Sequence, residues 1–114
     1  MTTFASVVAN DLDEVHMIAG DYKTFRYVIY DENDVLVDLS SATCSVAIFK
    51  YGDPTNVFCV LPGTVIGVGI FTATFTSALS VGLSGVYQQQ PKIVDYLGNT
   101  HIPSQGKIVI FPST

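Results

Sequence analysis

Residues 20–43, GDYKTFRYVIYDENDVLVDLSSAT, contain the pattern that decides the fold class. Aromatic and β-branched residues between Phe25 and Tyr30 alternate with a period of two, which predicts a strand with one buried face. The polar residues 31–34 predict a turn, and residues 35–37 predict a short returning strand. We therefore expect a β-hairpin here, and no residue pattern in it indicates catalysis.

The rest of the chain repeats this arrangement of short strands separated by turn residues. Alternation is clearest in residues 69–76, where Phe71, Ala73 and Phe75 are expected to face inward and the intervening threonines outward. Turn signals recur about every 8 to 12 residues and no long helix is expected, which is typical of an all-β sandwich. We predict one antiparallel β-sandwich of about seven to nine strands.

The predicted domain covers residues 13–114, and residues 1–12 are expected to form an N-terminal arm or an edge strand. Residues 77–84 favour a loop over one helical turn, because the stretch is short and contains Gly82. Pro91 interrupts a strand pattern and predicts an edge strand or a bulge. The expected core residues share the inward side of their strands: Phe25, Tyr27, Ile29, Leu39, Cys44, Val46, Ile48, Phe71, Phe75, Tyr87, Ile108 and Ile110.

Composition narrows the class of partner. Charged residues make up 13% of the 114 residues, whereas soluble domains average about 25%. We expect another chain to cover some apolar surface, the alternative being a small domain whose surface is rich in Ser and Thr. The net charge of −5 without a basic stripe argues against nucleic acid and anionic membranes as partners.

The same sequence gives no sign of export or of a membrane anchor. The N-terminus lacks the positive region of a secretory signal peptide, so synthesis in the cytoplasm without processing is expected. Glycine and proline break the longest weakly polar run, residues 57–70, and no segment is expected to span a membrane.

No motif predicts a metal, a cofactor or catalysis, and we expect the protein not to be an enzyme. His16 and His101 are far apart in sequence, and no Cys-x-x-Cys occurs. Residues 31–34 superficially resemble a calcium loop but lack its glycine and its terminal glutamate. Cys44 and Cys59 are expected to be buried and inert; a disulfide between them is the less favoured alternative, because cytoplasmic thiols usually stay reduced.

Six tyrosines form the best polar aromatic set of the chain. Tyrosine is favoured at protein interfaces and on sugar-stacking surfaces, although packing in the core and rim is the alternative for each one. The absence of Trp weakens a carbohydrate platform. The polar run 88–90 faces either a partner or solvent. The predicted partner-binding residues are Phe4, Val7, Val8, Tyr30, Tyr51, Gln88 and Gln90.

Three short motifs carry a resemblance to a known family. Tyr-Asp-Glu-Asn stands at residues 30–33, Val-Asp-Leu-Ser-Ser-Ala-Thr at 37–43 and Gly-Val-Tyr at 85–87. Their order resembles the immunoglobulin-like N-terminal domain of phage baseplate upper proteins, and related modules of tailed-phage structural proteins, over residues 20–111. The resemblance implies an immunoglobulin-like sandwich that acts in a virion through protein–protein contacts and has no enzymatic activity.

The resemblance also implies the partners and leaves alternatives open. The expected partners are other virion structural proteins and further copies of the chain, as a homo-oligomer or multi-copy assembly with a trimer ahead of a dimer or hexamer. Because the chain stops at Thr114 without the family's extension toward a stalk, a capsid decoration, head-fibre or joining protein is one alternative. A carbohydrate- or cell-surface-binding module, with a host-surface glycan as ligand, is another.

Overall fold

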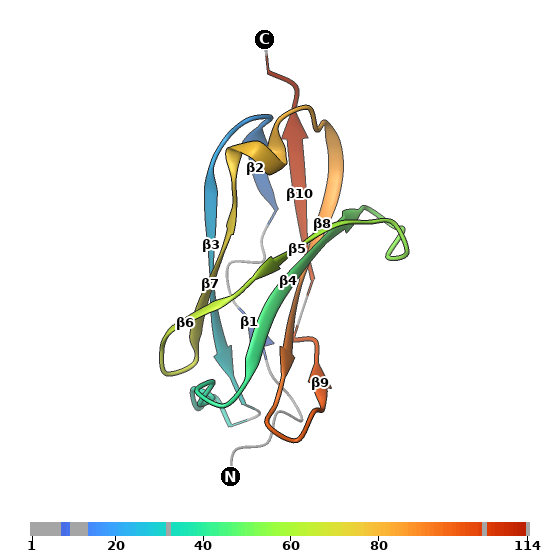
Figure 1. Ribbon diagram of the computed structural model, residues 1–114. Coiled ribbons are helices and arrows are strands. Elements are labelled where there is room, and N and C mark those ends of the chain that lie inside the picture. The colour runs from blue at the N-terminus through green and yellow to red at the C-terminus, as the bar shows by residue number, and fades with distance from the viewer. Residues whose placement is uncertain (1–7, 10–13, 32, 104, 114) are drawn as a thin grey trace.

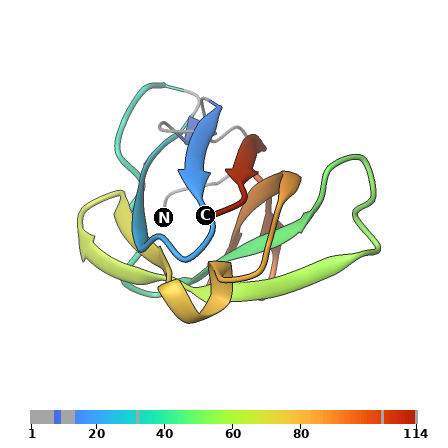
Figure 2. The ribbon, with the colours of Figure 1, turned by 90° about the horizontal axis from the view of Figure 1, so that it is seen from above.

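A computed structural model describes residues 8–9, 14–31, 33–103 and 105–113. Two sheets pack face to face, as seen from the side in Figure 1 and from above in Figure 2. The smaller sheet has the order β1 (Val8–Ala9), β3 (Lys23–Tyr30), β7 (Ile70–Phe75) and β6 (Thr64–Gly67). The larger sheet has the order β2 (Val15–Ile18), β10 (Gly106–Phe111), β8 (Gly85–Val94), β4 (Thr43–Lys50) and β5 (Val57–Pro62), with β9 (Thr100–His101) paired to β8.

This strand order confirms the predicted immunoglobulin-like β-sandwich. The smaller sheet corresponds to strands A, B, E and D of that fold, and the larger sheet contains the equivalents of G, F and C. All described pairs are antiparallel except β2 with β10, which is parallel. Strand β1 belongs to the smaller sheet, whereas β2, the next strand in sequence, belongs to the larger one. Without the two-residue strands β1 and β9, the described strands number eight, within the expected range. None of the described helices is long and apolar enough to cross a membrane.

The core lies between the sheets and contains the residues that alternation predicted. Of the predicted core residues only Tyr87 is not fully buried; it packs half-buried against the cluster. The rings of Tyr27 and Phe71 stack at a centroid distance of 4.9 Å in the middle of this core. The Tyr27 hydroxyl donates a hydrogen bond to Gln89 Oε1, so β3 and β8 are joined by one fully buried polar contact between the two sheets.

One run of chain joins the two sheets along an edge of the sandwich. Strand β5 pairs with β4 in the larger sheet, and β6 continues it but pairs with β7 in the smaller sheet. The change of partner occurs at Gly63, whose N–H donates a 2.9 Å hydrogen bond to the carbonyl of Cys44. The sequence predicted only a break at this glycine. In the fold it is a crossing point, visible in Figure 1 as the strand that runs diagonally across the molecule.

The predicted hairpin at residues 31–37 forms, but its second arm is short. Leu36 bridges back to Tyr30 at the end of β3. Backbone hydrogen bonds flank this bridge, from the Asp31 amide to the Val35 carbonyl at 2.8 Å and from the Val37 amide to the Ile29 carbonyl at 3.1 Å. Along the rest of its length β3 pairs with β1 and β7. The turn itself is present, because the Asp31 carboxylate accepts hydrogen bonds from the amides of Asn33 and Val35. The returning arm ends after Val37, which is buried in the core, because the chain then crosses to the larger sheet and begins β4.

Pro91 lies in a central strand, so the prediction of an edge strand was wrong. Strand β8 has β4 on one side, where Pro91 pairs with Val46. On the other side the ladder with β10 ends at Gln89, and the ladder with β9 begins only at Ile93. The missing N–H of Pro91 is tolerated because no described strand pairs with β8 on this side at that position.

The less favoured helical turn is present as α1 (Ser77–Ser80). The Thr76 hydroxyl caps it by accepting a hydrogen bond from the Leu79 amide. Ser80 then fixes α1 to the loop before β3, because its fully buried hydroxyl accepts from the Gly20 amide at 3.0 Å and donates to the Asp21 carbonyl at 2.8 Å.

Replacing Ser80 by Ala is expected to lower the free energy of unfolding by about 1–3 kcal/mol, because the Gly20 amide and the Asp21 carbonyl lose their partner in a partly buried place. Denaturant unfolding of S80A measures the effect. The matched control is S77A, since Ser77 is exposed on the same helix, and a change below about 0.5 kcal/mol is expected there. Equal losses in both variants would contradict the bridging role of Ser80.

Acidic residues stabilise several turns through local hydrogen bonds. Asp95, between β8 and β9, accepts hydrogen bonds from the amides of Leu97 and Asn99 and lies 3.0 Å from the His101 ring nitrogen Nε2. The His101 hydrogen bond, followed by the two backbone amides, holds the pKa of Asp95 below its ordinary value of 3.8. The ionised carboxylate is therefore the form that the fold requires.

The lowered pKa of Asp95 predicts a loss of stability in acid. A carboxyl whose pKa is lower in the folded state stabilises the fold above its unfolded pKa, and this contribution disappears as the pH falls through the folded pKa. The melting temperature of the wild type is expected to fall below about pH 4, and D95N is expected to show a smaller fall. The control D34N keeps every contact of Asp95, and its melting temperature should follow that of the wild type. If the melting temperature of D95N fell in acid as much as that of the wild type, Asp95 would not be the carboxyl responsible.

Candidate contact surface on the larger sheet

The larger sheet has one face in the core and the other exposed. Val46, Ile48, Ile93 and Ile108 point into the core. Because side chains alternate along a strand, their neighbours point outward. We call this outer side the contact face: His16, Ile18, Phe49, Tyr51, Val86, Gln88, Gln90, Gln105, Lys107, Val109 and Phe111.

Three glutamines form a hydrogen-bonded ladder across the centre of the contact face. Gln88 Nε2 donates to Gln105 Oε1 at 3.4 Å, and Gln105 Nε2 donates to Gln90 Oε1 at 2.5 Å. Gln88 Oε1 accepts from the Gly52 amide at 3.3 Å, which ties the ladder to the β4–β5 loop. These side chains are already ordered, so a partner that binds them loses less side-chain entropy.

Beside the ladder, one cation is fixed over an aromatic ring. Lys107 pairs with Gln88 in the register of β10 and β8, and its Nζ lies 5.0 Å from the centroid of the Tyr51 ring. The same Nζ is 3.5 Å from Glu14 Oε1. The pKa of Glu14 is held below its ordinary value, first by a hydrogen bond with His16 and then by Lys107. These pairs are exposed and contribute little to stability, but they position the ammonium group on the face.

The other half of the contact face is apolar. Exposed side chains of Ile18, Val86 and Phe111 lie here, with 55%, 36% and 47% of their surface accessible. The His16 ring packs edge-on against Phe111, with 5.7 Å between ring centroids. Phe49 also points outward yet is buried, which places an apolar centre beneath this surface. An apolar region next to a polar, ordered ladder is typical of protein interfaces.

The structure brings together some of the predicted partner-binding residues. Tyr51, Gln88 and Gln90 lie on the contact face. Tyr30 does not, because it ends β3 in the smaller sheet. Phe4 and Val7, with most of the predicted arm, lie outside the described part of the chain. Of Val8 only the backbone is described; it belongs to β1, which pairs with β3.

Sequence reasoning missed several residues of this surface. Lys107, Val109 and Phe111 alternate with the predicted core residues of the same strand, so the period of two already placed them on the outer side. Gln105 carried no such signal, because it lies before β10 in a turn region. Its part in the ladder follows only from the fold.

The described residues contain no group of three or more His, Cys, Asp or Glu side chains that could hold a metal ion. Cys44 and Cys59 are free thiols, and burial raises the pKa of each to about 11, so little thiolate forms at neutral pH. Cys44 lies beside Gly63, and Cys59 lies four residues before that glycine, which separates the two thiols by about 13 Å along the strand.

The fold has known counterparts, although no family model and no curated protein matches the chain. CopC from Methylosinus trichosporium OB3b is 12% identical, with a TM-score of 0.58 over 96% of this chain and 95% of that one. The GspB Siglec domain is 16% identical, with a TM-score of 0.59 over 97% of this chain and 60% of that one. The Lin-41 filamin domain is 14% identical, with a TM-score of 0.51 over 92% and 89% of the two chains. At these identities the likeness establishes the sandwich fold alone.

Proposed function

We propose that the chain is a non-enzymatic structural component of a tailed-phage virion, of the tail or baseplate type, that acts through protein–protein contacts of its contact face. The observation that carries the proposal is the juxtaposition on one sheet of exposed aromatic and aliphatic side chains with an ordered glutamine ladder. The motif at residues 37–43 and the immunoglobulin-like fold support the placement in a virion. Other virion proteins and further copies of the chain are the proposed partners.

The face is suited to a permanent contact between chains. Phe111, Ile18 and Val86 would lose exposed apolar surface on docking, which is the main favourable contribution to association. The glutamine amides supply hydrogen bonds that fix the register of the partner. Low charge across the chain removes much of the cost of desolvating ions.

Mass spectrometry of density-gradient-purified virions tests the proposal. Peptides of this chain are expected in the particle fraction in a fixed ratio to a major structural protein, and they should stay there after a salt wash. A non-structural protein from the same lysate serves as the control for contamination. If the chain is missing from every particle fraction, the virion role is wrong.

A capsid decoration, head-fibre or joining role is the alternative within the virion. Separating heads from tails before the same measurement distinguishes the sites. The tail or baseplate proposal expects the chain to follow the tail fraction, and recovery with heads would replace it by the decoration role.

Glycan binding is a second candidate, favoured by the arrangement around Tyr51. Its half-exposed ring, the ammonium of Lys107 and the amide of Gln88 lie close together, and sugars are bound by such mixtures of aromatic and polar groups. The Siglec domain of GspB shares the fold. A glycan array tests this candidate: binding that Y51A abolishes and Y22A retains would favour it, and no bound glycan would remove it.

A further inference from the structure

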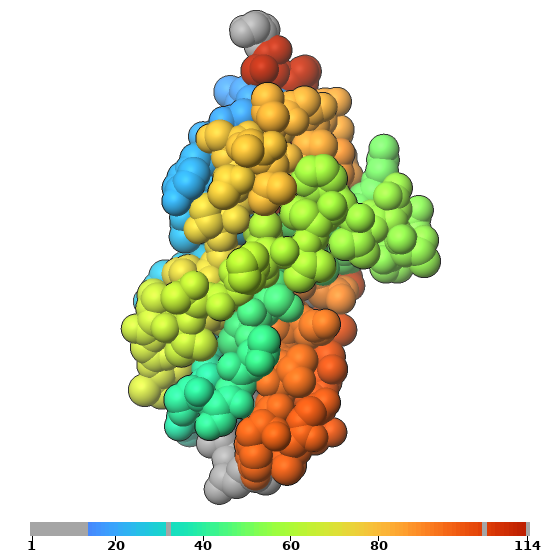
Figure 3. All heavy atoms as spheres, in the orientation of Figure 1, coloured from blue at the N-terminus to red at the C-terminus, as the bar shows by residue number. Residues whose placement is uncertain are grey.

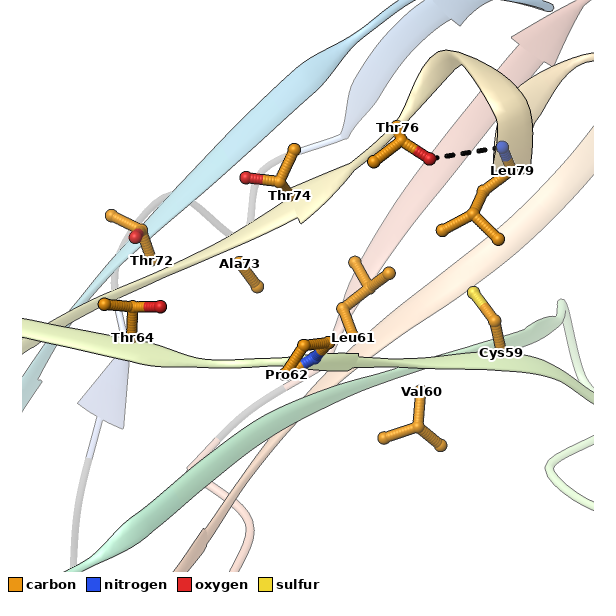
Figure 4. A pocket seen from close by; sticks show the side chains of 10 residues that line it. All are labelled: Cys59, Val60, Leu61, Pro62, Thr64, Thr72, Ala73, Thr74, Thr76 and Leu79. Carbon is orange, nitrogen blue, oxygen red and sulfur yellow. Dashed lines mark hydrogen bonds between the residues drawn. The ribbon is translucent and has the colours of Figure 1, made fainter.

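A groove lies where β5 and β6 cross from one sheet to the other. It has a volume of about 370 Å³ and lies between β7 with α1 on one side and the crossing strand on the other (Figure 4). Leu61 and Ala73 point toward each other at its floor, and Cys59 lies toward Leu79 near one end. In Figure 3 the crossing strand and its loops stand out from the body of the molecule along this edge.

The wall of the groove formed by β7 is an open sheet edge. The ladder between β6 and β7 runs from Gly67 with Ile70 to Thr64 with Thr72 and then stops. Residues 73–75 of β7 continue to pair with β3 on their other side, but no described strand pairs with them on the side of the groove. Alternate backbone N–H and C=O groups there point into the groove, which makes it a place for an added strand.

The groove selects an uncharged occupant. No Asp, Glu, Lys or Arg occurs between Asp53 and Lys92, the part of the chain that forms every wall of the groove. Threonine hydroxyls on β7 line its rim, and apolar side chains line its floor. An extended, uncharged segment with an apolar anchor therefore matches it best, because a charge would be desolvated without a partner.

The N-terminal segment of the chain has this composition. Residues 1–10, MTTFASVVAN, carry no charged side chain, and residues 2–7 are rich in β-branched residues around the aromatic Phe4. Such a segment favours an extended conformation, and Phe4 supplies one large apolar group for a pocket.

The segment cannot fill the groove of its own chain. Val8 pairs with Tyr30, whereas the open edge of β7 lies opposite residues 23–25 of β3. Five to seven strand residues separate these points, about 17–23 Å. Phe4 stands four residues before Val8, so it reaches at most about 14 Å from it. Strand β1 is also antiparallel to β3, so the direction from Ala9 back to Val8 leads away from residues 23–25.

We infer that residues 2–7 of one copy add as a strand to the open edge of β7 in a second copy, with Phe4 seated in the groove beside Cys59. The added strand takes the place in the smaller sheet that β6 leaves when the chain crosses at Gly63. Repetition of the contact joins copies into an assembly. This inference does not depend on the contact face, and its test uses the isolated protein.

Disulfide cross-linking tests whether residue 4 of one copy lies in the groove of another, because Cys59 already lines the groove. The variant F4C, oxidised with copper phenanthroline, is expected to give covalent dimers or larger multimers on a non-reducing gel. The double variant F4C/C59S, which keeps Cys44, is expected to give no covalent multimers on the same gel. A disulfide within one chain, or no bond between position 4 and Cys59 in peptide maps, would overturn the inference.

A pair of substitutions on neighbouring strands provides the matched control. Thr74 lines the groove, and its hydroxyl lies 3.2 Å from that of Thr24, which is exposed on β3 away from the groove. In the F4C background, T74R is expected to abolish the covalent multimers, whereas T24R should keep them. Equal yields in both variants would contradict the groove as the docking place, and circular dichroism verifies that both remain folded.

Discussion

Replacing Gly63 with alanine is expected to lower the free energy of unfolding by about 3 kcal/mol. A Cβ at this position would lie 2.7 Å from the carbonyl oxygen and 2.9 Å from the carbonyl carbon of Cys44. These are backbone atoms of a central strand, so a side-chain rotation cannot relieve the contact. The chain has to move at the point where it changes sheets, and the 2.9 Å hydrogen bond from the Gly63 amide is strained with it.

Denaturant unfolding of G63A measures this effect, and two variants separate its causes. Gly67 lies on the same run of chain, but the Cβ added in the variant G67A would meet only Ile70 Cδ1 at 3.8 Å, which is an ordinary contact. It should change the stability by less than about 0.5 kcal/mol. The double variant C44A/G63A should remain unstable, because the obstacle is backbone. Wild-type stability of that variant, or equal losses of stability in G63A and G67A, would show that the close approach of Gly63 to the Cys44 backbone is not the cause of the loss.

The second large effect is expected at Tyr27. Its side chain is fully buried, stacks on Phe71 and donates a hydrogen bond to the buried Gln89. Y27A is expected to lower the free energy of unfolding by about 3–5 kcal/mol, since it leaves a cavity between the sheets and removes the partner of Gln89. Chemical denaturation followed by circular dichroism is the measurement.

Two further variants distinguish the polar contact from the packing. Y27F keeps the ring and removes only the hydroxyl, so a loss of about 1–3 kcal/mol is expected. Gln89 Nε2 has no hydrogen-bond partner among the described residues, so the amide is only partly satisfied even in the wild type. The double variant Y27F/Q89L should therefore be more stable than Y27F. If it were less stable than Y27F, Gln89 would stabilise the fold more than leucine does even without the Tyr27 hydroxyl.

The fold could be predicted from the sequence where one local rule acts alone. Alternation placed Phe71 and Phe75 in the core, because the side-chain period of a strand depends only on the backbone. It predicted that residues 35–37 return along β3, but not how far, because the length of that pairing depends on which strands occupy the edges of β3. It also failed to distinguish a break from a crossing at Gly63, since both require a flexible residue and only the distant strand β4 decides between them.

The candidate site shows the same limit. Tyr51 and Gln88 were selected by residue type, and the fold places both on one face. Sequence spacing could not join them to Gln105, because that contact depends on the register of β8 with β10. Tyr30 was selected for the same reason as Tyr51 but belongs to the other sheet. The groove left no trace in the sequence, since it arises from a ladder that ends at Thr64 and Thr72.

Lysine footprinting in purified virions tests whether the contact face is covered in the particle. Lys107 lies on the contact face, whereas Lys23 begins β3 in the smaller sheet. Acetylation of intact particles and of the isolated protein, followed by peptide mass spectrometry, compares the two side chains in each state. Lys107 is expected to become protected in the particle, while Lys23 should react as it does in the isolated protein. Unchanged reactivity of Lys107 in particles that contain the chain would show that the contact face stays uncovered.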